Sequence, residues 1–121
     1  MKNKKFLIEA IEKYSFYTKA QRRLLRALVE LEEDYLIKAT VLELSQLSVM
    51  SRASVYRCID TFKKEKVLEF QDSNSSSLNL FKLNKNKLEE IEKNHLKKLS
   101  LHKKWKNYAK IIWQNKTSSI S

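Results

Sequence analysis

The segment that decides the fold spans residues 51–66 and reads Ser51-Arg52-Ala53-Ser54-Val55-Tyr56-Arg57-Cys58-Ile59-Asp60-Thr61-Phe62-Lys63-Lys64-Glu65-Lys66. Read as a helix, it repeats apolar side chains at three- and four-residue spacing, which places them on one buried stripe: Val55, Cys58, Ile59 and Phe62. The opposite side carries Ala53, Tyr56, Arg57, Asp60 and Lys64. Ser51 is placed to cap the first turn. The spacing therefore predicts an amphipathic helix over residues 52–65.

The outward side of this helix has a composition suited to DNA. Arg, Tyr, Ser and Lys side chains can reach base edges and phosphates when a helix lies in the major groove. An ordinary amphipathic helix with a solvated face is the alternative, and for this helix taken alone it is the simpler interpretation. The neighbouring segments favour the DNA interpretation.

The segments before residue 51 predict a helix-turn-helix. Thr18-Lys19-Ala20-Gln21 has capping-box spacing and opens a helix with the apolar positions Leu24, Ala27, Leu28 and Leu31, which ends at the acidic cluster Glu32-Glu33-Asp34. Residues 35–39 form a short apolar segment, which suits a strand. A second capping box at Thr40 predicts a helix over 41–47, with Val41, Leu44 and Leu47 inward. Residues 48–50 then form a tight link to the helix at 52–65, which is the spacing of a helix-turn-helix pair.

The segment after residue 66 predicts a β-hairpin. Residues 67–70 and 78–83 suit two strands, and the polar run 71–77 suits the loop between them. A hairpin directly after a recognition helix is the layout of a wing, whose tip touches DNA. Asn74 would supply the positive-φ position that Gly usually takes. A hairpin that only covers the core is the alternative, and Asp72 is the only charge in the loop, which argues against strong phosphate binding there.

Helices are expected at both ends. Phe6, Ala10, Ile11 and Tyr14 share a stripe in a helix over 4–14. Asn86 is placed to cap a long helix over 87–113, and residues 114–121 are expected to fray. The early apolar positions Leu88, Ile91, Leu96 and Leu99 do not align with the later ones, so we expect a bend near Ser100 or two helices. The later positions suit dimer packing: Leu101, Trp105, Tyr108 and Ile112.

The same helix carries a run of lysines without an acid: Lys93, Lys97, Lys98, Lys103, Lys104, Lys106 and Lys110. This run suits a second contact with the DNA backbone. A solvated surface is an equally good interpretation, and an anionic membrane surface is a minor one.

Composition narrows the class of protein. The 121 residues suit one domain, and 25 Lys and Arg against 14 Asp and Glu give a net charge of +11, which favours a polyanionic partner. Gly and Pro are both absent, so we expect Asn, Asp and Ser to build the turns, and Gly-rich phosphate loops are excluded. Cys58 is the only cysteine, and no apolar run has the length of a signal peptide or a membrane span, so we expect a cytoplasmic protein.

Chemistry-bearing residues do not form a catalytic or metal-binding pattern. His95 and His102 are about 10 Å apart along one helix, too far to share a metal ion, and we expect them to be polar surface residues. The serines lie in loops and caps, and no serine is paired with a His and an acid. An enzyme is therefore not predicted.

Two motifs carry a family resemblance. The run Thr18-Lys19-Ala20-Gln21-Arg22-Arg23-Leu24-Leu25 resembles the opening of the DNA-binding domain of ferric uptake regulator proteins. Ser51-Arg52-Ala53-Ser54-Val55-Tyr56-Arg57 is similar to that family's recognition-helix signature, in which Thr commonly precedes Val-Tyr-Arg. Glu65-Lys66-Val67-Leu68 is placed where the family enters its wing, with Lys where Gly is usual. The likeness covers residues 18–83, and other winged-helix repressors share parts of it.

The resemblance implies roles for four residues. By this likeness Tyr56 contacts a base edge, Arg57 contacts a phosphate or a base, and Ser51 and Ser54 lie near the DNA backbone. The family's His- and Cys-rich metal-sensing and dimerisation domain is missing beyond residue 83, so iron or zinc sensing is not carried over.

These observations predict a mainly α-helical protein with a small β-hairpin: a winged helix-turn-helix over residues 1–83 and a Lys-rich C-terminal helical dimerisation extension over 84–121. The expected function is sequence-specific binding of double-stranded DNA, as a homodimeric transcriptional repressor. The alternatives are a plasmid or phage partition or replication protein, and a winged-helix module that binds protein only. No cofactor, metal or membrane partner is expected, and the sequence names no effector. The expected DNA-binding residues are Ser51, Arg52, Ser54, Tyr56, Arg57, Asp60, Lys63, Lys64, Asn74 and Arg22.

Overall fold

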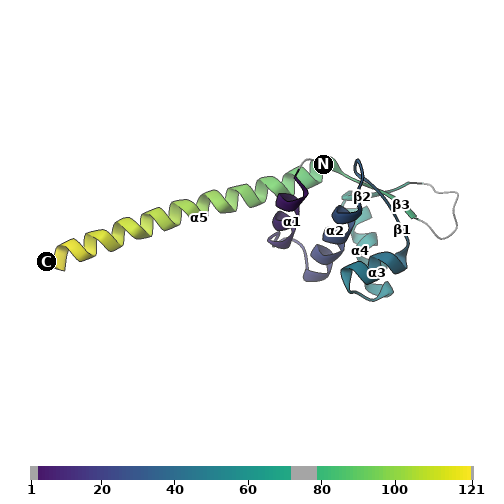
Figure 1. Ribbon diagram of the computed structural model, residues 1–121, viewed down its shortest axis with the longest axis horizontal. Helices are drawn as coiled ribbons and strands as arrows, with labels where there is room; N and C mark the ends of the chain where they lie inside the picture. The colour runs from purple at the N-terminus through teal and green to yellow at the C-terminus, as the bar shows by residue number, and fades with distance from the viewer. Residues whose placement is uncertain (1–2, 72–78, 121) are drawn as a thin grey trace.

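The computed structural model describes residues 3–71 and 79–120, with the backbone alone for residue 71 and residues 105–120. Figure 1 shows a globular body from which a single long helix extends as an arm. The mainly α-helical class with a small sheet is as predicted. In chain order the elements are α1 (Lys4–Glu12), α2 (Lys19–Leu31), β1 (Leu36–Ala39), α3 (Val41–Ser48), α4 (Arg52–Lys64), β2 (Leu68–Gln71), β3 (Asn79–Leu83) and α5 (Lys85–Ile120).

The sheet has three antiparallel strands in the order β1-β3-β2. The central strand β3 pairs Phe81 with Ile37 on one side and with Phe70 on the other. The predicted strands are thus confirmed to within a residue or two, and β1 adds a third strand to the hairpin. Asn74, the expected positive-φ residue of the hairpin loop, lies outside the described residues.

The core lies between the sheet and the helices of the body. All four apolar positions predicted for the 52–65 helix are buried, and Phe62 is fully enclosed. They pack with residues from every other part of the body into one cluster, which includes Leu24, Leu28, Leu44, Val55, Ile59, Phe62, Phe81 and Leu83. Each such side chain contributes about 1.5–3 kcal/mol by leaving water. Because the apolar side of α4 is buried, its polar side faces solvent.

The predicted start and end of α2 are both confirmed. The amide of Gln21 donates to Oγ1 of Thr18 at 3.2 Å, and the amide of Thr18 donates to Oε1 of Gln21 at 2.9 Å, which is the reciprocal capping box. The helix ends at Leu31, and Glu32 turns inward. Its buried carboxylate lies 3.2 Å from Nζ of Lys4 and accepts a hydrogen bond from the amide of Tyr35 at 2.8 Å.

The turns correct one expectation. Asn, Asp and Ser were expected to take the left-handed positions. Among the described residues Asp34 does so as expected, whereas the other left-handed residues are Tyr35, Val49 and Lys66. For Val49 and Lys66 the reason is helix termination. At the end of α3, the amides of Val49 and Met50 donate to the carbonyls of Gln46 and Ser45, at 3.3 and 3.0 Å.

Helix α4 ends with the same arrangement of two backbone hydrogen bonds. There the amides of Lys66 and Val67 donate to the carbonyls of Lys63 and Phe62, at 3.1 and 2.9 Å. This is the Schellman motif, which requires a left-handed residue just past the helix and usually takes Gly. In a chain without Gly, Val49 and Lys66 occupy these positions, and Lys66 is the position where the family resemblance has Gly.

In α3 one inward residue was wrongly predicted. Leu44 is fully buried and Val41 partly buried, but Leu47 is 50% exposed. Ser48 is buried in its place and donates its hydroxyl to the carbonyl of Leu44. At 100° per residue, Ser48 lies closer to Leu44 around the helix than Leu47 does, so the buried arc is displaced toward Ser48.

The C-terminal segment differs from the prediction in three ways. It is one continuous helix, without an interruption near Ser100, and it extends to Ile120 rather than fraying from residue 114. It begins at Lys85, and the capping side chain is Asn84 rather than Asn86, because Oδ1 of Asn84 accepts from the amides of Asn86 and Lys87. The shift in the apolar pattern marks a change of surroundings, not a bend.

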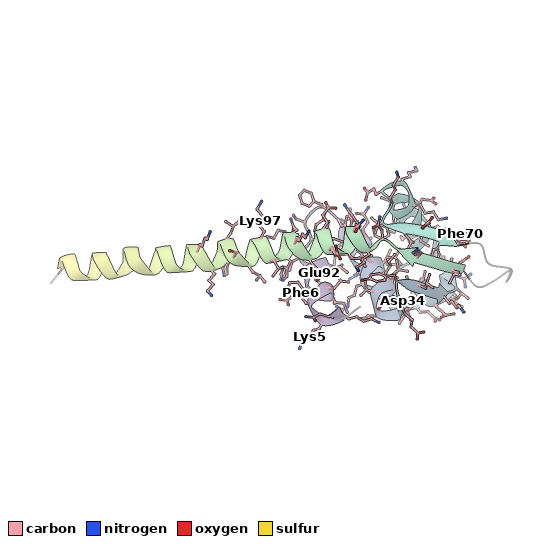
Figure 2. All side chains as sticks on the ribbon, turned by 90° about the horizontal axis from the view of Figure 1, so that it is seen from above. Lys5, Phe6, Asp34, Phe70, Glu92 and Lys97 are labelled. Atoms are coloured by element: carbon pink, nitrogen blue, oxygen red, sulfur yellow. The ribbon has the colours of Figure 1, made fainter. Side chains whose placement is uncertain are left out.

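Only the first part of α5 packs on the body. Leu88 and Ile91 are buried in the core cluster, whereas Leu96, Leu99 and Leu101 are 55, 45 and 58% exposed. Figure 2 shows Lys97 where the arm emerges from the body. Among the described residues no helix is long and apolar enough to cross a membrane.

Two expectations, for His95 and for the apolar side of α1, were wrong. His95 was expected on the polar surface but is 5% exposed, with its ring 5.4 Å from the ring of Phe6 and its Nε2 3.7 Å from Oε1 of Glu9. Phe6, expected in the core, packs on His95 and is only half-buried, while Leu7 is fully buried. Helix α1 lies between the body and α5, so it has two apolar sides where the sequence pattern suggested one.

Candidate nucleic-acid interface

The outward side of α4 is open to a ligand. Tyr56 is 56% exposed, and Arg57 beside it is also exposed. The buried stripe behind them fixes the helix against the body, so this side cannot turn inward. The expected DNA-binding residues Arg52, Asp60, Lys63 and Lys64 are exposed on the same helix, and Ser54 is half-buried.

A hydrogen-bonded network orders the first turn of α4. Oγ of Ser51 accepts from the amide of Ser54 at 3.2 Å and so caps the helix as predicted. The Ser51 hydroxyl donates to Oγ of Ser54 at 3.0 Å, and Nη2 of Arg57 donates to the same oxygen at 3.2 Å. Arg57 is therefore held toward the helix N-terminus. A guanidinium has five N–H donors, so most of them remain for a base or phosphate.

Asp60 follows Tyr56 by one helical turn and brings a negative charge to this surface. It makes no ion pair with any of the described residues. A carboxylate repels phosphate but can accept a hydrogen bond from the amino group of cytosine. Asp60 is therefore suited to base discrimination rather than to general affinity.

Lys63 is separated from the group around Tyr56. It lies seven residues further along the helix, about 10 Å. Its Nζ lies 4.6 Å from the centre of the Phe70 ring, in a cation–π contact with β2. The structure thus brings Ser51, Ser54 and Arg57 together but places Lys63 at the base of the hairpin.

Sequence reasoning missed the aromatic support of α4. The ring of Tyr17 lies 5.5 Å from that of Phe62 and 4.8 Å from that of Tyr14. Its environment is apolar, and this burial raises the pKa of the Tyr17 hydroxyl well above its ordinary value, with Glu65 adding to the effect. The aromatic run from Tyr14 to Tyr17 was the available signal.

A second basic group lies at the start of α2. Arg22, an expected DNA-binding residue, is half-buried and donates from Nη1 to the carbonyl of Glu12 at 3.1 Å. Arg26 pairs with Glu12 and, at 3.2 Å, with Glu30. Lys19 and Arg23 are exposed and were not predicted, although their spacing on one helix face was visible in the sequence. These cations surround a small hollow of about 270 Å³.

The remaining expected residues are only partly described. Leu101 is exposed on the arm, and the side chains of Trp105, Tyr108 and Ile112 lie outside the described residues, as does Asn74. Within the part of the chain that is described, no three His, Cys, Asp or Glu side chains gather as a metal site would require.

Solved structures show which fold this is. A possible transcriptional regulator from Methanosarcina mazei Go1 superposes with a TM-score of 0.51 and 18% identity, over 82% of this chain and 85% of that one. The chain has a winged helix-turn-helix fold. A MarR-family transcriptional regulator from Silicibacter pomeroyi gives 0.50 and 12%, and Staphylococcus aureus MarR in complex with salicylate and kanamycin gives 0.52 and 16%.

The extent of these matches differs. The match to the Silicibacter pomeroyi regulator covers 77% of this chain and 66% of that protein. The match to Staphylococcus aureus MarR covers 81% of this chain and 63% of that protein. No family model matches the sequence, and no curated protein matches it. The predicted winged helix is thus confirmed as a fold, whereas the ferric uptake regulator resemblance is not confirmed.

Proposed function

We propose that this protein binds double-stranded DNA in a sequence-specific way and acts as a transcriptional regulator. One observation carries the proposal: the second helix of the helix-turn-helix presents Tyr56 and Arg57 to solvent above a fully buried stripe. Helix α4 would lie in the major groove, with Tyr56, Arg57 and Asp60 at base edges. Ser51, Arg52, Ser54 and Lys64 would contact the backbone.

The charge of the chain supports a DNA partner. A net charge of +11 gives affinity for phosphate that is independent of sequence and falls as salt rises. Lys19 and Arg23 at the start of α2 are exposed and would add backbone contacts, while Arg22 is partly engaged with the end of α1. We expect the positions on α4 to set sequence preference and these cations to set general affinity.

We further propose a homodimer, in which residues 84–121 are a dimerisation extension of the winged-helix unit. The arm supports this, because three leucines on it are exposed: Leu96, Leu99 and Leu101. Its 36 residues extend for about 54 Å, long enough to pair with the arm of a second copy. A two-fold dimer would present two α4 helices to half-sites about one DNA turn apart, roughly 34 Å. Trp105, Tyr108 and Ile112 would complete the contact.

Mapping the bound sites tests the function. Genomic fragments recovered with the protein should contain one palindrome beside a promoter, and a repressor would lower transcription from it. Repeated sites near a replication origin would favour the partition or replication alternative. Absence of any gel retardation at low salt would contradict DNA binding and favour a module that binds protein. A DNA-bound regulator would work in the cytoplasm, which agrees with the single unpaired cysteine, Cys58.

A further inference from the structure

A hollow at the base of the hairpin is not used by the proposed DNA contact. It has a volume of about 780 Å³, in the usual size range of small-molecule sites. Figure 2 shows Asp34, one of the residues that line the hollow, on the body and far from Lys97 on the arm. Four lysines line the hollow together with two acids: Lys63, Lys66, Lys82, Lys85, Asp34 and Glu69.

The four lysines come from four separate segments. Lys63 is on α4, Lys66 is in the turn after it, Lys82 is on β3 and Lys85 opens α5. The ion pairs found among the described residues, at up to 4 Å, involve other cations. Glu69 is opposite Lys82 in the sheet register but does not reach it. Its four lysines outnumber its two acids, and among the described residues none of these lysines forms an ion pair.

The walls of the hollow are joined by backbone and side-chain hydrogen bonds. Asn84 donates from Nδ2 to the carbonyl of Lys66 and from its amide to the carbonyl of Val67, both at 2.9 Å. The amide of Leu83 donates to the carbonyl of Tyr35 at 2.8 Å. The cation–π contact with the Phe70 ring holds the side chain of Lys63, which lines the hollow. The lysines are thus gathered on a firm frame, so binding would require little reordering of the backbone.

We propose that this hollow binds a small polyanion, a compact molecule with two or more phosphate or carboxylate groups. Ammonium groups are point charges that bind such anions from several directions. Tyr35, which is half-buried, lines the same hollow and offers an apolar surface to the body of the molecule. An anion there would relieve the mutual repulsion of the four lysines.

The DNA backbone is the competing source of phosphate, and the geometry favours a small molecule. The hollow is concave, and it lies at the end of the hairpin opposite the loop that joins β2 and β3. Tyr56 and Arg57 are on the N-terminal half of α4, whereas only the last turn of that helix reaches the hollow. A molecule in the hollow would contact α4, the hairpin and the root of the arm together.

Calorimetric titration of the full chain with inorganic pyrophosphate, at physiological salt, tests the inference. The test variant is K82Q/K85Q, and the matched control is K38Q/K97Q, which removes the same charge from exposed lysines outside the hollow. Wild type should show saturable one-site binding. The test variant should bind at least about tenfold more weakly, and the control within about twofold of wild type, because charge-assisted contacts are local.

Three results would overturn the inference. One is the absence of saturable pyrophosphate binding by the wild type. Another is an equal loss in both double variants, which would mean that only net charge matters. The third is a loss of DNA affinity in K82Q/K85Q as large as its loss of pyrophosphate binding, which would make the hollow a DNA-backbone contact. A failure of DNA binding by the wild type leaves the pyrophosphate measurement valid, so the two proposals are tested separately.

Discussion

Nζ of Lys98 donates a hydrogen bond to the backbone carbonyl of Lys13 at 2.9 Å, across 85 residues of sequence. The same ammonium lies 3.5 Å from Oγ of Ser15. Lys98 thereby ties the arm to the junction of α1 and α2, one turn beyond the buried ring of His95. In the dimer proposed above, this contact would help to set the angle between each arm and its DNA-binding body.

Removing this contact should loosen the arm. Lys98→Ala should lower the free energy of unfolding by only about 0.5 kcal/mol, because the bond is partly open to water. It should, however, speed hydrogen exchange in residues 13–17 and 92–100. Lys97→Ala, one position away on the exposed side, is the control. Equal exchange in the two variants would show that Lys98 does not anchor the arm.

Val49 should be a site of stored backbone strain. It has φ 55° at the end of α3 and is 79% exposed, so its side chain contributes little packing. A β-branched residue in this region is unfavourable, and Val49→Gly should stabilise the fold by roughly 0.5–1 kcal/mol in urea denaturation. Val49→Ala keeps a Cβ atom and should gain less. A loss of stability with Gly would show that the turn does not strain Val49.

Glu32 should contribute more to the free energy of unfolding than its acidic neighbours do. Its carboxylate is 2% exposed and serves both Lys4 and the amide of Tyr35. Glu32→Ala would leave that amide without a partner and should cost about 2–3 kcal/mol. Glu33→Ala, on an exposed side chain, should cost less than about 0.5 kcal/mol. Thermal and urea unfolding of the two variants compares them directly, and equal losses would argue against the buried ion pair.

Cys58 should be unreactive while the protein is folded. Burial raises the pKa of its thiol. The positive charge of the neighbouring Arg57 acts in the opposite direction but is the smaller effect, so the pKa stays raised. A raised pKa reduces the thiolate fraction at neutral pH, so labelling by a disulfide reagent should be slow and should accelerate as pH rises. In denaturant the same thiol should react at once. Fast labelling of the native protein at pH 7 would mean that the inner side of α4 is not packed as described.

The sequence allowed the body to be predicted because its signals were local and mutually consistent. The capping residues Thr18, Thr40 and Ser51 mark three helix starts, and the stripe behind Tyr56 specifies which side of α4 is buried. Two of the errors, at His95 and at the cap of α5, arise from tertiary contacts. His95 is buried because α1 covers it, and Asn84 rather than Asn86 caps α5 because Asn84 is also bonded to the α4–β2 turn.

The sites were less predictable than the fold. Exposure of Arg57 follows from periodicity, but its bond to Ser54 depends on side-chain placement. The hollow at the hairpin base could not have been foreseen, because Lys63, Lys66, Lys82 and Lys85 converge only through the pairing of β2 with β3. The left-handed backbone of Val49 and Lys66 was not predicted, because the composition suggested Asn, Asp and Ser for such positions. The Schellman motif requires a left-handed residue just past the helix, and these two residues occupy that position.

The affinity of Arg57→Ala for a mapped genomic site, measured by fluorescence anisotropy, tests the central claim most directly. Loss of a contact with a base edge should cost about 1–3 kcal/mol at that site and little on unrelated DNA. Lys97→Ala, which removes the same charge from the arm, should affect all sequences alike. Circular dichroism would establish that both variants are folded. An affinity for the mapped site that Arg57→Ala leaves unchanged would contradict the assignment of α4 to the major groove.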